Sequence, residues 1–306
     1  MKTIIDWLLQ GDVSLQYLTH KYLLNTEENH LNNLQARIAT EGWGKRFLDA
    51  RNASGHWGRG FYQPKWISSH YTLLDLRFLE IEPVEPISET IALILAQSTA
   101  PNGSINESRS IPSGDVCVNG MFLNYAAFFG TPEDQLKSVV DYLLDNIMPD
   151  GGFNCEGKTK GAHHSSMHTT MSALEGIWEF IKAGYSYRVD ELHQARLTAE
   201  EFLLMHQLYK SDKTGEVINN KWTMLSFPSR WFYDILRALV YLADADRSYD
   251  PRMKAALELL MSKRRKDGAW PIQAKHPGLV HFDMEQTGAP RRFNTLRALR
   301  VQEKYG

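Results

Sequence analysis

Three residues that commonly bind zinc stand at the starts of two successive apolar helices in the sequence. Asp115 and Cys117 open one of these helices, and His168 opens the next. Carboxylate, thiolate and imidazole are all good zinc ligands, and three protein ligands leave one coordination position open, as in catalytic sites. We therefore expect a Zn²⁺ site formed by Asp115, Cys117 and His168, with the same three residues as the catalytic group.

Two further residues bear on the number of ligands. Cys155 and His164 lie in the turn and loop before His168, and the i, i+4 spacing of His164 and His168 allows one helical face to hold both. Either residue in the fourth position would close the site and make it structural, or change its substrate. Ordinary structural roles remain open as well: cysteine is often a small buried hydrophobe, Asp115 suits a helix N-cap, and His168 suits a hydrogen-bonded histidine.

A repeated helical unit must position these residues. Five segments share one layout, in which a helix-like stretch leads to a Gly-containing turn, an irregular loop and a second apolar helix. Equivalent positions recur roughly every 50 to 65 residues, at His70, Asn119, His168, Tyr233 and Phe293.

The two kinds of helix predict two layers. The second helices are apolar on most sides, as in 236–242, which indicates burial all round. The first helices are amphipathic, as in 136–145, where apolar and acidic residues alternate at helical spacing. Strand signals are scarce, so we expect an all-α fold with inner and outer helix layers, an α/α barrel of about five helical hairpins. An open α-solenoid is the alternative.

The turn at 150–153, followed by His168-Thr169-Thr170 and the segment 174–177, resembles the repeat shared by protein prenyltransferase β subunits and squalene/terpene cyclases. The resemblance extends over roughly residues 35–300 and lies in repeat structure rather than in long identity. It implies an α/α toroid whose inner-helix N-termini border a central cavity. Residues 35–306 would then form the toroid domain, and residues 1–34 an N-terminal helical cap.

Zinc-dependent prenyltransferase β subunits carry Asp-x-Cys at one inner-helix start and His-Thr at the next. The resemblance therefore implies that Asp115, Cys117 and His168 bind zinc, which in that family activates a substrate thiol as the thiolate. It also implies a diphosphate-binding role for Arg109, although Pro112 replaces the lysine of the family pattern. A helical partner subunit is a further implication, because protein prenyltransferases work with one.

Large flat side chains gather at the inner-helix starts. We expect these side chains, together with Arg109, to bind substrate at the mouth of one cavity. They are Trp66, His70, Tyr71, Trp231, Tyr233 and Phe293. An aromatic lining suits an isoprenoid or another hydrophobic small molecule, and cation–π attraction would favour an allylic carbocation. The loop 275–285 is expected to lie on the substrate side because long loops are often functional.

Composition excludes several classes of protein. The net charge of −2 and the lack of a basic tract argue against nucleic acid as a partner. The longest apolar runs fall far short of the roughly 20 residues needed to span a bilayer. Two cysteines cannot form a disulfide framework, so we expect a reduced, cytoplasmic protein.

These observations predict an isoprenoid-handling enzyme with zinc at one rim of the toroid. Two other functions remain open. One is a non-catalytic toroid that binds a hydrophobic ligand or a partner. The other is a carbohydrate-active α/α-barrel enzyme, which needs paired carboxylates across a cleft; Asp115, Glu107 and Asp283 are the candidates.

Overall fold

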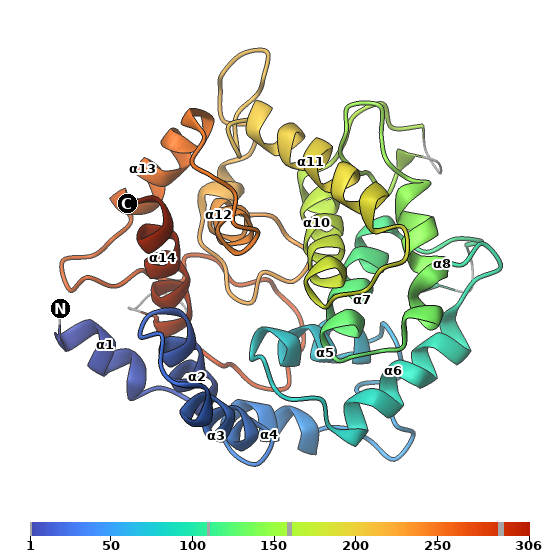
Figure 1. Cartoon of the computed structure of the whole chain (residues 1–306), viewed down its shortest axis with the longest axis horizontal. Helices are drawn as coiled ribbons and strands as arrows, with labels where there is room; N and C mark the ends of the chain where they lie inside the picture. Colours follow the sequence, from blue (N-terminus) through green and yellow to red (C-terminus); the bar gives the residue numbers. More distant parts are fainter. Residues whose placement is uncertain (1, 109–110, 158–160, 287–290) are drawn as a thin grey trace.

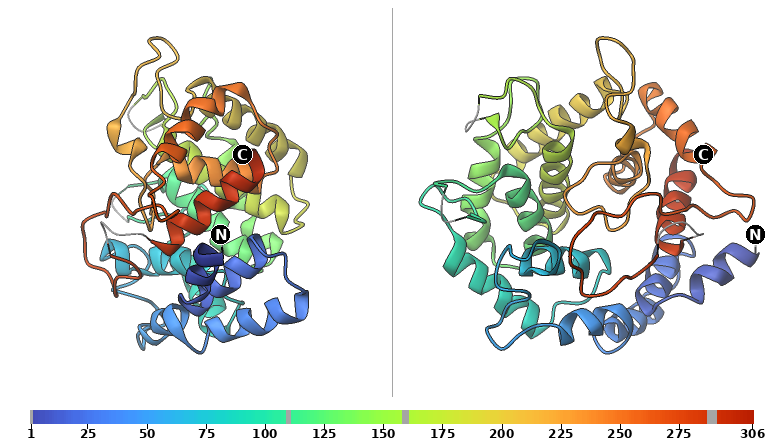
Figure 2. Two further views of the ribbon diagram at one scale, coloured as in Figure 1. Left: turned by 90° about the vertical axis from the view of Figure 1, so that its left-hand side faces the viewer. Right: turned by 180° about the vertical axis from the view of Figure 1, so that it is seen from behind.

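The computed structural model describes residues 2–108, 111–157, 161–286 and 291–306. In these ranges the chain is helical, and β structure is limited to isolated bridges. The helices form a ring of two concentric layers, an α/α toroid (Figures 1 and 2). The inner helices are α2 (Val13–Tyr22), α5 (Ser69–Phe78), α7 (Val116–Phe128), α10 (Met167–Lys182), α12 (Ile235–Asp244) and α14 (Arg292–Tyr305).

The outer layer alternates with the inner one along the chain. It consists of α1 (Lys2–Leu9), α3 (Glu28–Ile38), α4 (Gly42–Asp49), α6 (Glu85–Ser98), α8 (Glu133–Leu144), α11 (Val189–Met205) and α13 (Lys254–Ser262). Short 3₁₀ turns lie at Lys65–Ile67, Asn220–Thr223 and Pro251–Met253. No described helix is both long enough and apolar enough to cross a membrane.

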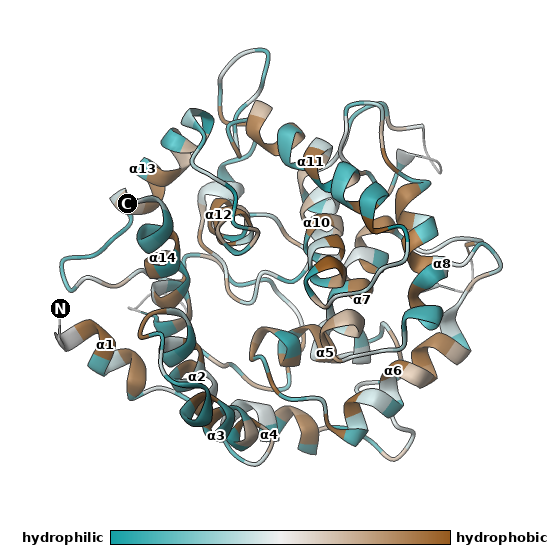
Figure 3. Ribbon diagram, viewed as in Figure 1, coloured by the Kyte–Doolittle hydropathy of each residue, from teal (hydrophilic) through white to brown (hydrophobic). Residues whose placement is uncertain are grey.

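Inner helices are buried on most sides and outer helices on one face, as the sequence predicts. Nearly every side chain of α7 from Val116 to Ala127 is buried, so this helix has no solvent-facing side. In α8 the buried residues are confined to one face, which includes Leu136, Val140 and Leu143. Figure 3 shows both hydrophobic and hydrophilic turns along the outer helices. The prediction of an all-α fold with inner and outer layers is thus confirmed.

One hydrogen bond recurs in four of the five repeats and fixes the Gly turn to the inner helix that follows it. The backbone N–H of a buried apolar residue in the turn donates to a polar side chain in the first turn of the helix. The pairs are Trp57 to Ser69 (3.1 Å), Ile105 to Asn119 (2.7 Å), Phe153 to Thr170 (2.9 Å) and Trp270 to Thr295 (2.9 Å). Trp57 and Trp270 also donate their indole N–H to outer-helix carbonyls, so both rings join the two layers.

Thr170→Val is expected to destabilise the protein by about 1–3 kcal/mol, because the buried N–H of Phe153 loses its acceptor. Urea unfolding measures the change. Thr40→Val is the matched control, since the Thr40 side chain is exposed and its loss leaves no buried group unpaired. Equal midpoints for the two variants would contradict this role of Thr170.

Helices α7 and α10 approach each other very closely at two glycines. A Cβ added to Gly176 would lie 2.2 Å from the carbonyl oxygen of Gly120, and one added to Gly120 would lie 2.5 Å from that of Ser172. The backbones therefore meet without intervening side chains. This contact places the start of α7, with Asp115 and Cys117, beside the start of α10.

The N-terminal helices pack against both neighbours in the ring. Helix α2 buries Val13, Leu15 and Leu18, and it contacts α14 as well as α3 and α4. Helix α1 also contacts α14. The segment predicted as a cap thus brings the two ends of the chain together (Figure 1), and residue 34 lies within α3.

Candidate metal centre

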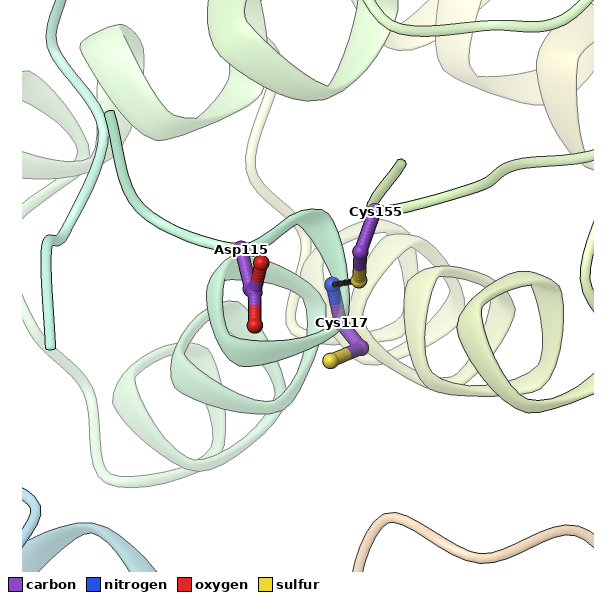
Figure 4. Close-up of side chains that lie close together, drawn as sticks. All are labelled: Asp115, Cys117 and Cys155. Atoms are coloured by element: carbon purple, nitrogen blue, oxygen red, sulfur yellow. Dashed lines mark hydrogen bonds between the residues drawn. The ribbon is translucent and has the colours of Figure 1, made fainter. Parts of the chain in front are cut away.

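The structure brings three candidate ligands together at the start of α7. The Asp115 carboxylate and the sulfurs of Cys117 and Cys155 lie within 4.8 Å of one another. Figure 4 shows these side chains together, with the backbone N–H of Cys117 donating to Cys155 Sγ at 3.3 Å. Neither cysteine is in a disulfide. All three residues are partly buried, so the group is neither a surface cluster nor sealed in the core.

Local structure explains how these residues meet. Asp115 occupies the N-cap position of α7, but its side chain makes no capping hydrogen bond, so that ordinary role does not account for the carboxylate. Cys155 follows the Gly turn that Phe153 fastens to α10 through Thr170. Cys155 Sγ lies 3.4 Å from Thr169 Oγ1, also in α10. The α7–α10 contact therefore aligns the two halves of the group.

The acidic and thiol groups of this site shift one another's pKa values. A hydrogen bond with Cys117 lowers the pKa of Cys155. A hydrogen bond with Cys155, together with burial, raises the pKa of Cys117 well above its usual value, and the charges of Asp115 and Glu107 add to the effect. Burial, together with the Asp115 carboxylate, raises the pKa of Glu107 to about 7. Glu107 Oε2 accepts the backbone N–H of Asp115 at 3.2 Å.

The described structure does not bring His168 or His164 into the group. His168 Nδ1 accepts the backbone N–H of Tyr233 at 2.8 Å, so the ring is held toward the next repeat. Burial lowers the pKa of His168 to about 4. His164 is exposed, and its carbonyl accepts a hydrogen bond from Asn154. Arg109 lies outside the described residues.

The aromatic residues predicted to bind substrate pack mainly against one another. Trp66 contacts Tyr71 edge to face and donates its indole N–H to the carbonyl of Pro277 at 2.6 Å. Trp231 stacks on Phe232, with ring centroids 3.9 Å apart. Tyr71 is fully buried. The rings of Trp66, Tyr71, Trp231 and Phe232 therefore pack together at this end of the ring of helices.

The remaining aromatic candidates have other partners. The buried Tyr233 donates its hydroxyl to the carbonyl of Leu208. Phe293, in the first turn of α14, stacks on Phe227 at 4.1 Å and lines a cavity inside the ring. His70 Nδ1 lies 3.3 Å from the Tyr125 hydroxyl, while its Nε2 is buried without a hydrogen-bond partner.

The segment 271–286 crosses the end of the ring where the inner helices begin (Figure 2, right). His276 stacks on Phe232 with centroids 3.8 Å apart, and His281 Nε2 lies 2.9 Å from Thr72 Oγ1. Asp283 pairs with Lys275 at 2.5 Å, and it does not belong to the group that contains Asp115.

Sequence reasoning named Tyr71 as a substrate-binding residue but missed its neighbour Tyr62. Tyr62 and Tyr71 have hydroxyls 3.2 Å apart. Burial raises the pKa of Tyr62, and the charges of Cys117, Glu107 and Asp115 raise it further. The aromatic-rich stretch before α5 was the available signal. Its contact with α7 depends on the ring and cannot be derived from spacing.

Because His70 is buried, we expect the folded protein to lose stability in acid. Burial lowers the pKa of His70 to about 3, whereas an unfolded histidine titrates near 6.5. Between these values the unfolded chain binds a proton that the folded protein does not. His70 alone should therefore reduce the free energy of unfolding by up to about 1.4 kcal/mol for each unit that the pH falls below about 6.5.

Urea unfolding at several pH values between 7 and 4 tests this prediction. His70→Gln should show a shallower fall in stability than the unmodified protein, by about one proton. His30→Gln is the matched control because His30 is exposed. An unchanged slope in His70→Gln would contradict the assignment.

Comparisons with known proteins support the fold. No protein-family model and no curated protein matched the chain. The structure of a polysaccharide lyase aligns with this chain at 13% sequence identity and a TM-score of 0.53. The alignment covers 99% of this chain and 97% of the lyase chain. A glycosyl hydrolase family 88 structure from Bacteroides vulgatus aligns over 94% and 88%, at 12% identity and a TM-score of 0.52. The type II terpene cyclase MstE from Scytonema aligns over 89% and 97%, at 14% identity and a TM-score of 0.34. At these identities the first two similarities show that the chain has the fold of an α/α toroid.

Proposed function

We propose that this protein is a zinc-dependent enzyme with Asp115, Cys117 and Cys155 as the metal ligands. The observation that carries the proposal is the proximity of one carboxylate and two thiols within 4.8 Å, contributed by separate segments. Zinc–sulfur bonds of about 2.3 Å and zinc–oxygen bonds of about 2.0–2.2 Å place tetrahedral ligands a little under 4 Å apart. The donor set therefore fits zinc after small side-chain movements.

Three ligands leave one position for a substrate atom or water. Bound there, zinc would act as a Lewis acid and lower the pKa of a coordinated thiol or water. The hydroxyls of Tyr62 and Tyr71 lie 3.2 Å apart, and burial together with the charge of Cys117 raises the pKa of both. Reduced thiols suit a cytoplasmic location.

We propose an isoprenoid, transferred or rearranged from its diphosphate, as the substrate. The repeat resemblance and the aromatic surroundings of Trp66 and Tyr71 support this substrate class. Segment 271–286 packs on these aromatic residues, because Trp66 is bonded to Pro277 and Phe232 is stacked on His276.

Metal analysis of the purified chain tests the proposal. We expect about one zinc per chain, lost on dialysis against a chelator and restored by added Zn²⁺. A prenyl diphosphate should then bind the zinc-loaded protein more tightly than the metal-free protein. Less than about 0.2 zinc per chain after Zn²⁺ addition would contradict the metal site.

A carbohydrate-active enzyme is the second candidate, favoured by the contact between Glu107 and Asp115. A carboxyl group with its pKa raised to about 7 beside a second carboxyl group resembles an acid–base pair. Fold similarity to the polysaccharide lyase and the glycosyl hydrolase is consistent with it. Hydrolysis or elimination of an oligosaccharide that persists in excess chelator would favour this function over the zinc enzyme.

A further inference from the structure

A second polar site lies inside the ring, away from the metal centre. There the middle and later parts of α2, α5, α7 and α10, together with α12 and the first half of α14, enclose a cavity of about 110 Å³. Its wall includes Tyr22, Asn124, Trp178, Arg237, Leu296 and Arg297. The metal candidates instead stand at or before the starts of α7 and α10, so the two sites are separated along the helix axes.

The acidic side chains of the cavity wall already have cationic partners. The ion pairs are Glu80–Lys21 (2.6 Å), Glu175–Arg237 (2.6 Å), Asp244–Arg300 (3.1 Å) and Glu179–Arg77. These pairs neutralise the carboxylates within the protein. Arg297 is the one arginine of the wall without such an ion pair among the described residues.

Arg297 forms no ion pair with the described residues. Its Nη1 reaches the carbonyl of Ser226 at 3.5 Å, which is a weak contact. The charges of Asp234 and Glu175 attract Arg297 without forming an ion pair with it. Asp234 accepts from the backbone N–H of Arg237 at 2.9 Å and from the Ser226 hydroxyl at 2.5 Å, and Glu175 pairs with Arg237. A guanidinium has five N–H donors and stays protonated in proteins. Arg297 thus offers the cavity a positive charge and several donors.

The rest of the wall is largely apolar. Phe227 and Phe293 stack on each other, and Leu18, Leu296 and Val240 also line the cavity. One cation beside an apolar wall matches a singly charged head group on an apolar body. A phosphate dianion requires more positive charge than Arg297 supplies, whereas a carboxylate matches the planar guanidinium through two parallel hydrogen bonds.

We propose that this cavity binds a small organic carboxylate with an apolar body, with Arg297 as the residue that recognises the carboxylate. The site is distinct from the metal centre and does not depend on zinc. Binding therefore should be unchanged after the metal has been removed with a chelator. This property separates failure of the carboxylate site from failure of the proposed zinc enzyme.

Titration calorimetry with ligands of equal chain length tests the proposal. Hexanoate should bind saturably, and hexanol should bind roughly 10- to 100-fold more weakly, because it lacks the charge-assisted hydrogen bonds. Hexylammonium and inorganic phosphate should give no saturable binding. Equal affinities for hexanoate and hexanol, or tighter binding of phosphate, would overturn the assignment.

Arg297→Met tests the recognition residue directly. Hexanoate affinity should fall roughly 10- to 100-fold, while the urea midpoint stays equal or rises, because an unpaired cation leaves the protein interior. Arg265→Met is the control, since Arg265 is exposed and pairs with Asp267 outside the cavity. Unchanged hexanoate affinity in folded Arg297→Met would overturn the proposal.

Discussion

Cys117→Ser and Cys155→Ser are each expected to weaken zinc binding by more than roughly 100-fold, because each variant removes a thiolate ligand. Mutating a residue that only hydrogen-bonds to a ligand already costs about 10- to 100-fold in metal affinity, and losing the ligand itself should cost more. The two sulfurs and the Asp115 carboxylate form one group within 4.8 Å, so neither cysteine can substitute for the other. Competition with a colorimetric chelator measures the affinity. Cobalt substitution should show thiolate-to-metal charge transfer in the unmodified protein and weaker absorption in each variant.

Two histidine variants test whether the cysteines, rather than His164 or His168, bind the zinc. His164→Ala is the control, because His164 is exposed and lies outside the group. His168→Ala should also retain zinc affinity within about tenfold, because His168 bonds to the backbone of Tyr233. Full zinc affinity in Cys155→Ser, combined with its loss in His168→Ala, would show that the ligand set is Asp115, Cys117 and His168 instead.

Gly176→Ala is expected to destabilise the fold by roughly 2–3 kcal/mol, as overpacking does when neighbouring atoms are held in place. The new Cβ would stand 2.2 Å from the carbonyl oxygen of Gly120, and that atom belongs to helix backbone. Helices α7 and α10 must therefore separate. The higher helix propensity of alanine offsets this by only about 1 kcal/mol. Urea unfolding of metal-free protein measures the change.

Ser88→Ala is the control for introducing alanine into a helix, since Ser88 is exposed on α6. Its effect should stay within about 0.5 kcal/mol. Gly176→Val should be more destabilising than Gly176→Ala, because the added methyl groups need still more space. A Gly176→Ala protein as stable as Ser88→Ala would show that the two helices are not held in close contact.

Much of the ring could be predicted because its pattern is local. Apolar residues cover most sides of 236–242 and 118–123, which requires burial on all sides. Four of the five Gly turns carry an apolar or aromatic residue whose backbone bonds to the next inner helix, as Phe153 does to Thr170. Helix α2 was not recognised as an inner helix because its apolar residues are interrupted by Gln16, His20 and other polar residues.

The site was less predictable because contacts between distant segments orient its side chains. Spacing placed His168 at the correct helix start, but the N–H of Tyr233, 65 residues later, determines where its ring points. Cys155 was only an optional fourth ligand in the sequence. Its approach to Cys117 depends on the close contact at Gly120 and Gly176, which no local pattern encodes.

X-ray absorption at the zinc edge, on the zinc-loaded protein, tests the central claim most directly. With Asp115, Cys117 and Cys155 as ligands, the account predicts two sulfur neighbours at about 2.3 Å and oxygen neighbours at about 2.0–2.2 Å. A first shell with one sulfur and an imidazole nitrogen, or with no sulfur, would contradict it.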